Sequence, residues 1–208
     1  MYNPPAFHVD ENEAWRVVHH AGAGLFVRQS ARALQSVFAP VLVDETRTVL
    51  RSHVARANPW WRVADDDSLD VLVVFLAASA YVSPSLYPSR ARDPDVVPTW
   101  NYAAVEVRGT LRVVDDLEWK NAQVRALTAH FEEPRSPQWR VDDLDEDFLA
   151  RQLRAIVGLE IAVTSIEGKE KLSQNRPDED RRHVRAAFLE GTLLEQNTSQ
   201  WMRENDPS

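Results

Sequence analysis

The chain has 208 residues, a formal net charge of −8 and no cysteine. Its length fits one domain with a substantial core, and the lack of cysteine excludes disulfides, thiolate metal ligands, iron–sulfur clusters and cysteine nucleophiles. The negative charge argues against a nucleic-acid partner, because nucleic-acid binding needs a basic face.

The N-terminal residues lack the basic and apolar regions of a signal peptide. No apolar run reaches the roughly 20 residues that span a bilayer. We therefore expect a soluble cytoplasmic protein without a membrane partner.

The first third of the chain predicts a helix and then short strands. The helix begins at Asp10, with Glu13 three residues later in a capping-box arrangement, and ends at a Gly-rich segment at 21–24. The sequence Asn58-Pro59 predicts the start of a short helix, closed by residues 65–67. Between them, strand-like runs occupy residues 25–28, 35–43 and 48–54.

The remainder alternates between long strands and helices. Residues 69–77 predict a buried central strand that continues at 80–83, and the four prolines of residues 84–98 predict an irregular loop. Further strands are expected at 101–114 and 158–166, and helices at 117–131, 144–156 and 177–189.

Six or so strands with peripheral helices favour a mainly β (α+β) protein built on a small barrel, not a doubly wound sheet. Neither GxGxxG nor the P-loop pattern occurs. We expect a cofactor-binding domain over residues 1–190 and a helical tail over 191–208.

A first candidate site lies where the third strand meets the short helix. Arg56 and Asn58 stand beside free helix N–H groups, which suit an anionic group such as a phosphate or propionate. His53, at the end of the strand, suits metal ligation through a ring nitrogen. A capped helix with a surface arginine and a hydrogen-bonded histidine explains the same residues.

A second candidate is the run Thr99, Trp100, Asn101 and Tyr102, which leads from the proline-rich loop into a strand. Aromatic faces with a few aimed polar groups suit a flat heterocycle. An aromatic core cluster is the alternative interpretation.

A third candidate follows the strand at 158–166. Lys171, Ser173, Gln174 and Arg176 are amide, hydroxyl or cationic side chains that suit a carboxylate or phosphate across a subunit seam. A solvated turn before the next helix is the alternative.

These segments occur in a recognisable order: MYNPPAF, SHVARANP, AYVSPSLYPS, VVPTWNYAAVEVRG, IVGLEI and IEGKEKLSQNR. From residue 1 to about residue 190, the chain resembles the PaiB-like proteins, a family usually labelled FMN-binding negative transcriptional regulators. The resemblance implies a split β-barrel related to pyridoxamine-phosphate oxidases. It also implies a homodimer whose cofactor pockets are shared between two subunits.

The chain departs from the family pattern at three places. Phe38-Ala39-Pro40-Val41 replaces His-Leu-Pro-Phe, Leu86 replaces a tryptophan with Arg90 in a lysine's place, and Glu170 replaces an aromatic residue. These departures favour a specialised member of the family. Some PaiB-like chains use haem, and piperazate synthases, which close an N–N bond in N5-hydroxyornithine with loss of water, are the clearest case.

The resemblance therefore leads to a first hypothesis, a haem b enzyme. His53 would be the axial iron ligand, and Arg56 with Lys171 or Arg176 would pair with the propionates. Glu170 and Lys171 would be the catalytic residues, with Glu170 binding the ammonium group of a small cationic amino acid or moving a proton.

The second hypothesis is an FMN-binding reductase or regulator. Arg56, Asn58 and Lys171 would hold the FMN phosphate, and Trp100 and Tyr102 would flank the ring. A cofactor-free dimer that serves as a binding scaffold is a third option. It is disfavoured because buried polar groups without partners are costly.

Overall fold

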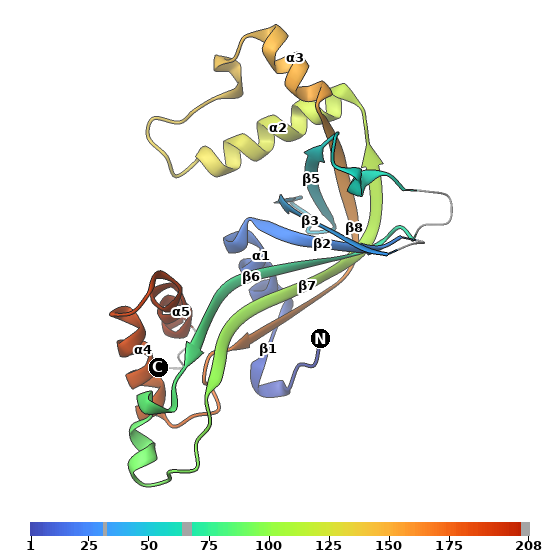
Figure 1. The fold of residues 1–208 in the computed structure, drawn as a ribbon. Coiled ribbons are helices and arrows are strands. Elements are labelled where there is room, and N and C mark those ends of the chain that lie inside the picture. The colour runs from blue at the N-terminus through green and yellow to red at the C-terminus, as the bar shows by residue number, and fades with distance from the viewer. Residues whose placement is uncertain (31–32, 64–67, 205–208) are drawn as a thin grey trace. The chain divides into compact units, whose positions relative to one another are not determined.

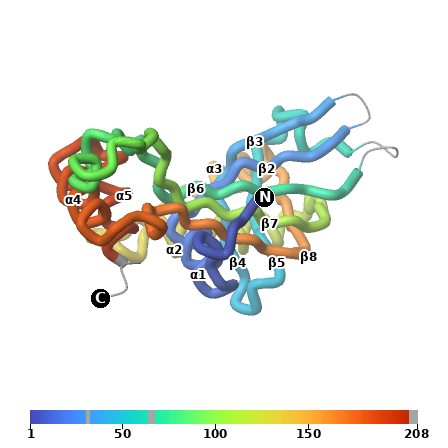
Figure 2. Tube along the Cα trace, turned by 90° about the horizontal axis from the view of Figure 1, so that it is seen from below, coloured from blue at the N-terminus to red at the C-terminus, as the bar shows by residue number. Residues whose placement is uncertain are grey.

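A computed structural model describes residues 1–30, 33–63 and 68–204 (Figures 1 and 2). The longer helices are α1 (Glu11–Ala21), α2 (Leu117–Glu132), α3 (Glu146–Arg154), α4 (Asp178–Leu189) and α5 (Leu193–Glu204). Short 3₁₀ helices are η1 (Pro5–Phe7), η2 (Pro59–Trp61), η3 (Pro84–Leu86), η4 (Pro88–Ala91) and η5 (Val141–Asp143).

The described strands form a mainly antiparallel sheet in the order β3-β2-β6-β7-β8-β5-β4, and β1 pairs with β8. They are β1 (His8–Val9), β2 (Ala23–Gln29), β3 (Leu34–Pro40), β4 (Leu42–Val43), β5 (Val49–Ala55), β6 (Asp70–Val82), β7 (Thr99–Val114) and β8 (Ile156–Lys171).

The chain divides into two compact units. Unit 1 comprises Met1–Ala21, Phe75–Glu106 and Ile166–Ser208, and unit 2 comprises Gly22–Val74 and Val107–Ser165. The three long strands β6, β7 and β8 each pass from one unit into the other. The expected boundary after residue 190 stays a prediction.

Unit 1 is built on an amphipathic helix and a helical pair. Trp15, Val17 and Val18 are buried on one face of α1, and the carboxylate of Asp10 accepts a hydrogen bond from the Glu13 amide at 3.0 Å, as the capping pattern predicts. Helices α4 and α5 pack side by side (Figure 2).

Unit 2 contains the β2–β3 hairpin, β4, β5 and the helical pair α2–α3 (Figure 1). In the β2–β3 register Leu25 pairs with Phe38, and in the β5–β8 register His53 pairs with Gly158. An alanine Cβ at position 158 would lie 2.1 Å from the Trp119 ring, so the glycine lets α2 approach the sheet.

The predicted elements occur in the predicted order, with differences in their bounds. The strand expected at 35–43 is two strands, interrupted at the buried residue Val41. The two pieces expected at 69–77 and 80–83 are the single strand β6. Helix α3 begins at Glu146, because Asp145 caps it through the Phe148 amide.

The largest difference concerns the third candidate segment. Residues 168–171, expected in a loop, continue strand β8 because Gly168 and Lys169 pair with β1. That partner is more than 150 residues away in sequence, so local pattern does not reveal it. The helix end expected at 65–67 and the last four residues of the expected tail lie outside the described residues.

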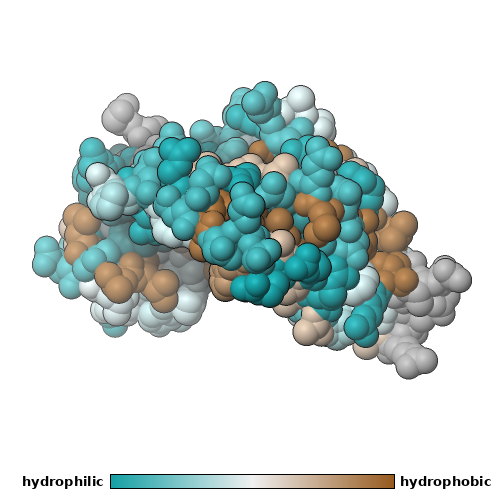
Figure 3. Space-filling model, turned by 90° about the horizontal axis from the view of Figure 1, so that it is seen from above, coloured by the Kyte–Doolittle hydropathy of each residue, from teal (hydrophilic) through white to brown (hydrophobic). Residues whose placement is uncertain are grey.

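Within the described part of the chain, none of the helices combines the length and apolar character needed to cross a bilayer. The face drawn in Figure 3 is mostly hydrophilic, with separate hydrophobic patches between the polar side chains.

Candidate cofactor site

Lys171 lies half-buried at the end of β8 in unit 1. Its ammonium group donates to the Trp100 carbonyl oxygen at 3.0 Å and contacts the Thr99 hydroxyl. Burial lowers the pKa of Lys171, and the cations Lys169 and Arg176 lower it further. Two further cations near this ammonium group favour an anionic ligand.

The turn after β8 holds this lysine in place. Ser173 has a left-handed backbone with φ of 69°, and its hydroxyl donates to Asn101 Oδ1 at 3.1 Å. The Gln174 amide oxygen accepts from Leu172 N at 2.7 Å, and its Nε2 donates to the Glu170 carbonyl at 2.7 Å. Three residues that were predicted to contact a cofactor therefore stabilise the turn itself: Asn101, Ser173 and Gln174.

An aromatic pair lies next to Lys171 in unit 1. The rings of Tyr81 on β6 and Trp100 on β7 are 6.0 Å apart, and both side chains are about half exposed. Trp100 Nε1 donates to the Ser79 hydroxyl at 2.8 Å. Tyr102 lies two residues along β7 and therefore on the same face, with its ring 5.6 Å from the Lys169 ammonium.

Arg176 contacts an aromatic ring in the same unit. Its guanidinium lies 4.5 Å from the centre of the Tyr87 ring. Burial raises the pKa of the Tyr87 hydroxyl, so this phenol is neutral at physiological pH.

The predicted catalytic residue Glu170 is 1% exposed. Its Oε1 accepts from Arg16 Nη2 at 3.2 Å, and Arg16 also pairs with Glu13 at 2.7 Å. The Arg16 guanidinium lies 4.1 Å from the Trp201 ring. In this structure Glu170 links β8 to α1, and its catalytic role stays a prediction.

In unit 2, His53 lines a pocket of about 200 Å³ under α2 and α3. The pocket is mainly apolar, and its other lining residues are Val124, Trp139, Val141, Leu144, Leu149, Gln152, Leu153 and Ile156. Burial lowers the pKa of His53, so the imidazole is neutral near pH 7. Its Nδ1 is buried and has no hydrogen-bond partner among the described residues.

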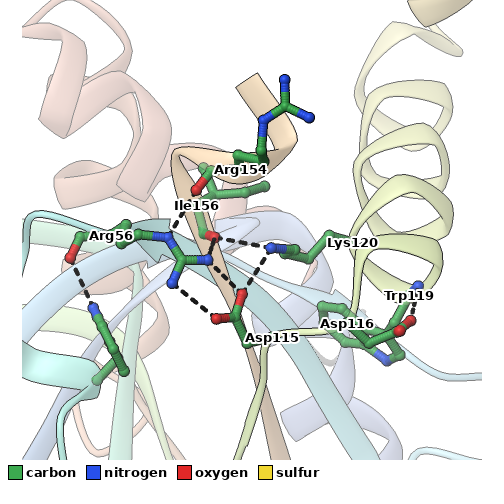
Figure 4. A network of polar contacts seen from close by, with 8 residues as sticks. Arg56, Asp115, Asp116, Trp119, Lys120, Arg154 and Ile156 are labelled. Carbon is green, nitrogen blue, oxygen red and sulfur yellow. Dashed lines mark hydrogen bonds and ion pairs between the residues drawn. The ribbon is translucent and has the colours of Figure 1, made fainter. Parts of the chain in front are cut away.

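Arg56 lies at the centre of a polar network (Figure 4). Two guanidinium nitrogens bind the Asp115 carboxylate, one of them at 2.8 Å, and Nε donates to the Arg154 carbonyl at 2.7 Å. The buried Lys120 ammonium binds the same carboxylate at 2.8 Å. Arg56 therefore joins the ends of β5, β7 and α3, and its predicted contact with a cofactor anion stays a prediction.

Asn58 caps the short helix η2. Its Oδ1 accepts from the Trp60 amide at 2.9 Å, which is the local structure that the Asn-Pro pattern indicates. The side-chain oxygen thus accepts a hydrogen bond from an N–H group at the start of the helix.

The predicted site residues fall into two groups, one in each unit. In unit 1, Lys171 contacts Thr99 and Trp100, and Ser173 contacts Asn101. The same unit contains Tyr102, Glu170, Gln174 and Arg176, whereas His53, Arg56 and Asn58 belong to unit 2. Sequence reasoning missed Tyr81, Asp115 and Lys120. Asp115 lies 59 residues from Arg56, so no local pattern could reveal their pairing.

Among the described residues, no group of three or more His, Asp or Glu side chains is arranged to hold a metal ion. An iron at His53 would therefore need the other ligands that a porphyrin brings.

The strand order and the structural neighbours define the class of protein by its fold: a mainly β split barrel with peripheral helices. The "FAD and Heme binding protein" of Mycobacterium smegmatis is similar with a TM-score of 0.57 and 17% identity, over 82% of this chain and 76% of that chain. The flavocytochrome Anf3 of Azotobacter vinelandii is similar with a TM-score of 0.56 and 10% identity, over 83% and 73% respectively. At such identities the likeness shows the fold alone.

The family follows from sequence. Residues 1–165 match the family model described as "Putative FMN-binding domain". The "Protease synthase and sporulation protein PAI 2" of Bacillus subtilis (strain 168) is 32% identical over 187 residues, covering 88% of this chain and 87% of that protein. The chain belongs to this PaiB-like FMN-binding family.

Proposed function

We propose that the protein binds FMN, with the Lys171 ammonium as the contact for the phosphate. The observation that carries the proposal is the charge around Lys171, since the charged groups that shift its pKa are the cations Lys169 and Arg176. Phosphate oxygens accept strong charge-assisted hydrogen bonds from such groups. The residues present therefore fit the cofactor named by the family model.

The aromatic pair completes the fit. Trp100 and Tyr81 offer half-exposed rings on neighbouring strands, which suit a flat isoalloxazine. Bound FMN would supply hydride and electron transfer, and the protein would bind and orient it. With FMN bound, the chain would act as a reductase or as a regulator.

Titration of the purified protein with FMN tests this proposal. We expect Lys171→Met to weaken FMN binding about tenfold, the loss of one charge-assisted hydrogen bond, and to leave riboflavin binding unchanged because riboflavin lacks the phosphate. Arg182→Gln, which removes an exposed cation of α4, is the matched control. Equal loss of riboflavin and FMN in Lys171→Met would contradict the phosphate contact.

A second candidate, haem binding, is favoured by one observation. His53 is a neutral imidazole whose buried Nδ1 has no partner in the described structure, and neutral imidazole is the form that ligates iron. Bound haem would supply a Lewis-acidic or redox iron. An absorption band near 400 nm that His53→Ala abolishes would support it, and a band unchanged by His53→Ala would exclude His53 as the ligand.

A more specific version of the haem hypothesis is that the protein is a piperazate synthase. In that reaction a bond forms between the α-amine nitrogen and N5 of N5-hydroxyornithine, the N–O bond breaks and water leaves, so no external oxidant is needed. Lys171, whose pKa is lowered, would move a proton, and Glu170 would bind the substrate ammonium in exchange for its ion pair with Arg16. Incubation of haem-loaded protein with N5-hydroxyornithine and detection of the cyclic hydrazine by mass spectrometry tests this candidate.

The remaining parts of the proposal concern the assembly and its location. We propose a homodimer that completes the cofactor pocket at its seam, and an apolar row on β2–β3 supports a subunit contact. This row comprises Leu25, Leu34 and Phe38, all of them exposed.

The absence of cysteine is compatible with the reducing cytoplasm. The charge of −8 gives no support for nucleic-acid binding.

A further inference from the structure

A charged row crosses the sheet of unit 2 beneath α2. Arg112 on β7, Glu160 on β8 and Arg51 on β5 lie on neighbouring strands, with Arg51 directly opposite Glu160 in register. Arg112 contacts Glu160 Oε2, and Arg51 Nε lies 3.5 Å from Glu160 Oε1. Two guanidinium groups thus share one carboxylate, which leaves one excess positive charge.

Helix α2 faces this row with two alanines, one tryptophan and one glutamine. Trp119, Ala122, Gln123 and Ala126 follow the spacing of one helical face, and together with the charged row they line a groove of about 420 Å³. The two alanines leave the space open, and Trp119 forms a fixed apolar wall because its Nε1 donates to Glu160 Oε1 at 2.9 Å.

Gln123 adds a donor that the protein does not use. The side chain is 4% exposed, and its Nε2 has no hydrogen-bond partner among the described residues. A buried amide N–H without an acceptor costs free energy. An acceptor entering the groove would remove that cost after a rotation of the Gln123 side chain.

We propose that this groove binds a small organic anion. Its carboxylate or phosphate oxygens accept hydrogen bonds from Arg112, Arg51 and the Gln123 amide, and its apolar part lies against Trp119 and Ala126. The site consists of unit 2 residues alone. It shares none of them with the proposed FMN contacts, which belong to unit 1. It is therefore a second ligand site, separate from the proposed FMN contacts.

Benzoate, phenyl phosphate and the neutral isostere benzamide are suitable probes. Each is titrated into the full-length protein while the indole N–H signal of Trp119, assigned with a Trp119→Phe variant, is followed by NMR. We expect saturable shifts with benzoate or phenyl phosphate at millimolar concentrations and none with benzamide. The stronger of the two anions identifies the head group, and equal responses to all three probes would overturn the proposal.

Three variants separate a ligand site from a structural ion-pair row. Arg112→Gln should weaken anion binding about tenfold, whereas Glu160→Gln should strengthen it several-fold because the competing carboxylate is gone. Ala126→Leu fills the groove from an exposed helix position and should abolish binding while the thermal midpoint stays unchanged. A Glu160→Gln variant that binds no more tightly than the unaltered protein, or an Ala126→Leu variant that still binds, would overturn the proposal.

Discussion

Single side chains decide which chemistry the two groups of candidate residues can support. His53 and Lys171 are both bases whose pKa values burial lowers, but their surroundings differ. The imidazole lines an apolar pocket, whereas the ammonium has two other cations nearby and contacts one backbone carbonyl and one hydroxyl. The first environment suits a neutral ligand atom, and the second suits an anion.

The neutral state of His53 predicts a pH dependence of stability. Its folded pKa lies below the ordinary value of 6.5, so between these two pKa values the unfolded chain binds more protons than the folded one. The free energy of unfolding therefore falls as pH decreases below 6.5 and levels off below the folded pKa.

Urea unfolding at pH 7 and pH 5 checks this prediction. We expect the loss of stability between the two pH values to be smaller in His53→Gln than in the unaltered protein. His183→Gln, at an exposed position of α4, is the control and should keep the full loss. Identical pH profiles for His53→Gln and the unaltered protein would show that His53 titrates normally in the folded state.

At the scale of elements, the Arg56–Asp115–Lys120 network holds four chain segments together. Arg56 follows β5, Asp115 follows β7, Lys120 belongs to α2, and the Ile156 carbonyl at the start of β8 accepts from Arg56 at 3.2 Å. The two cations hold the pKa of Asp115 well below its ordinary value of 3.8. The network therefore depends on an ionised carboxylate.

Asp115→Asn should lower the free energy of unfolding at pH 7 by about 1 kcal/mol, a modest figure because the half-exposed carboxylate is screened by solvent. The folded pKa is depressed, so this contribution is complete above pH 4 and disappears as pH falls through the folded value. The variant should thus lose less stability than the unaltered protein below pH 4.

A double-mutant cycle with Lys120→Met provides the control. Asp115→Asn leaves the buried Lys120 ammonium group without its partner carboxylate. The double variant should therefore be more stable than the sum of the two single losses predicts. Chemical denaturation at pH 7 and pH 3 measures all four proteins. Strict additivity would show that Lys120 and Asp115 act independently.

At the scale of the whole molecule, the proposed homodimer requires a surface where two copies would contact each other. Phe38 is 70% exposed and Leu25, its direct partner across β2–β3, is 40% exposed. Exposed apolar residues that adjoin on a sheet face favour a contact with another surface. Phe38 also falls in one of the segments where the chain departs from the PaiB-like pattern.

Phe38→Asp should convert the expected dimer into a monomer, because the contact would then bury an unpaired charge. Sedimentation equilibrium measures the molecular mass in solution. Leu193→Asp, at an 83% exposed position of α5, is the matched control and should leave the dimer intact. A Phe38→Asp variant that remains dimeric would move the proposed contact to another face.

Local pattern accounts for most of the fold. Alternating and apolar runs located β5, β6 and β7, and the capping residues Asp10 and Asn58 act as their positions predict. The extension of β8 to Lys171 could not be predicted, because it depends on pairing with β1. Likewise, the ion pair between Arg16 and Glu170 joins residues 154 positions apart.

The sequence by itself determined the family, the order of the elements and the residue types available for chemistry, because motifs, periodicity and caps are properties of neighbouring residues. Tertiary structure alone decided which of these side chains remain available to a ligand. Arg56 is engaged by Asp115, Glu170 is buried against Arg16, and Lys171 lies among cations. Such pairings depend on strand register and helix docking, which bring distant charges within hydrogen-bonding distance.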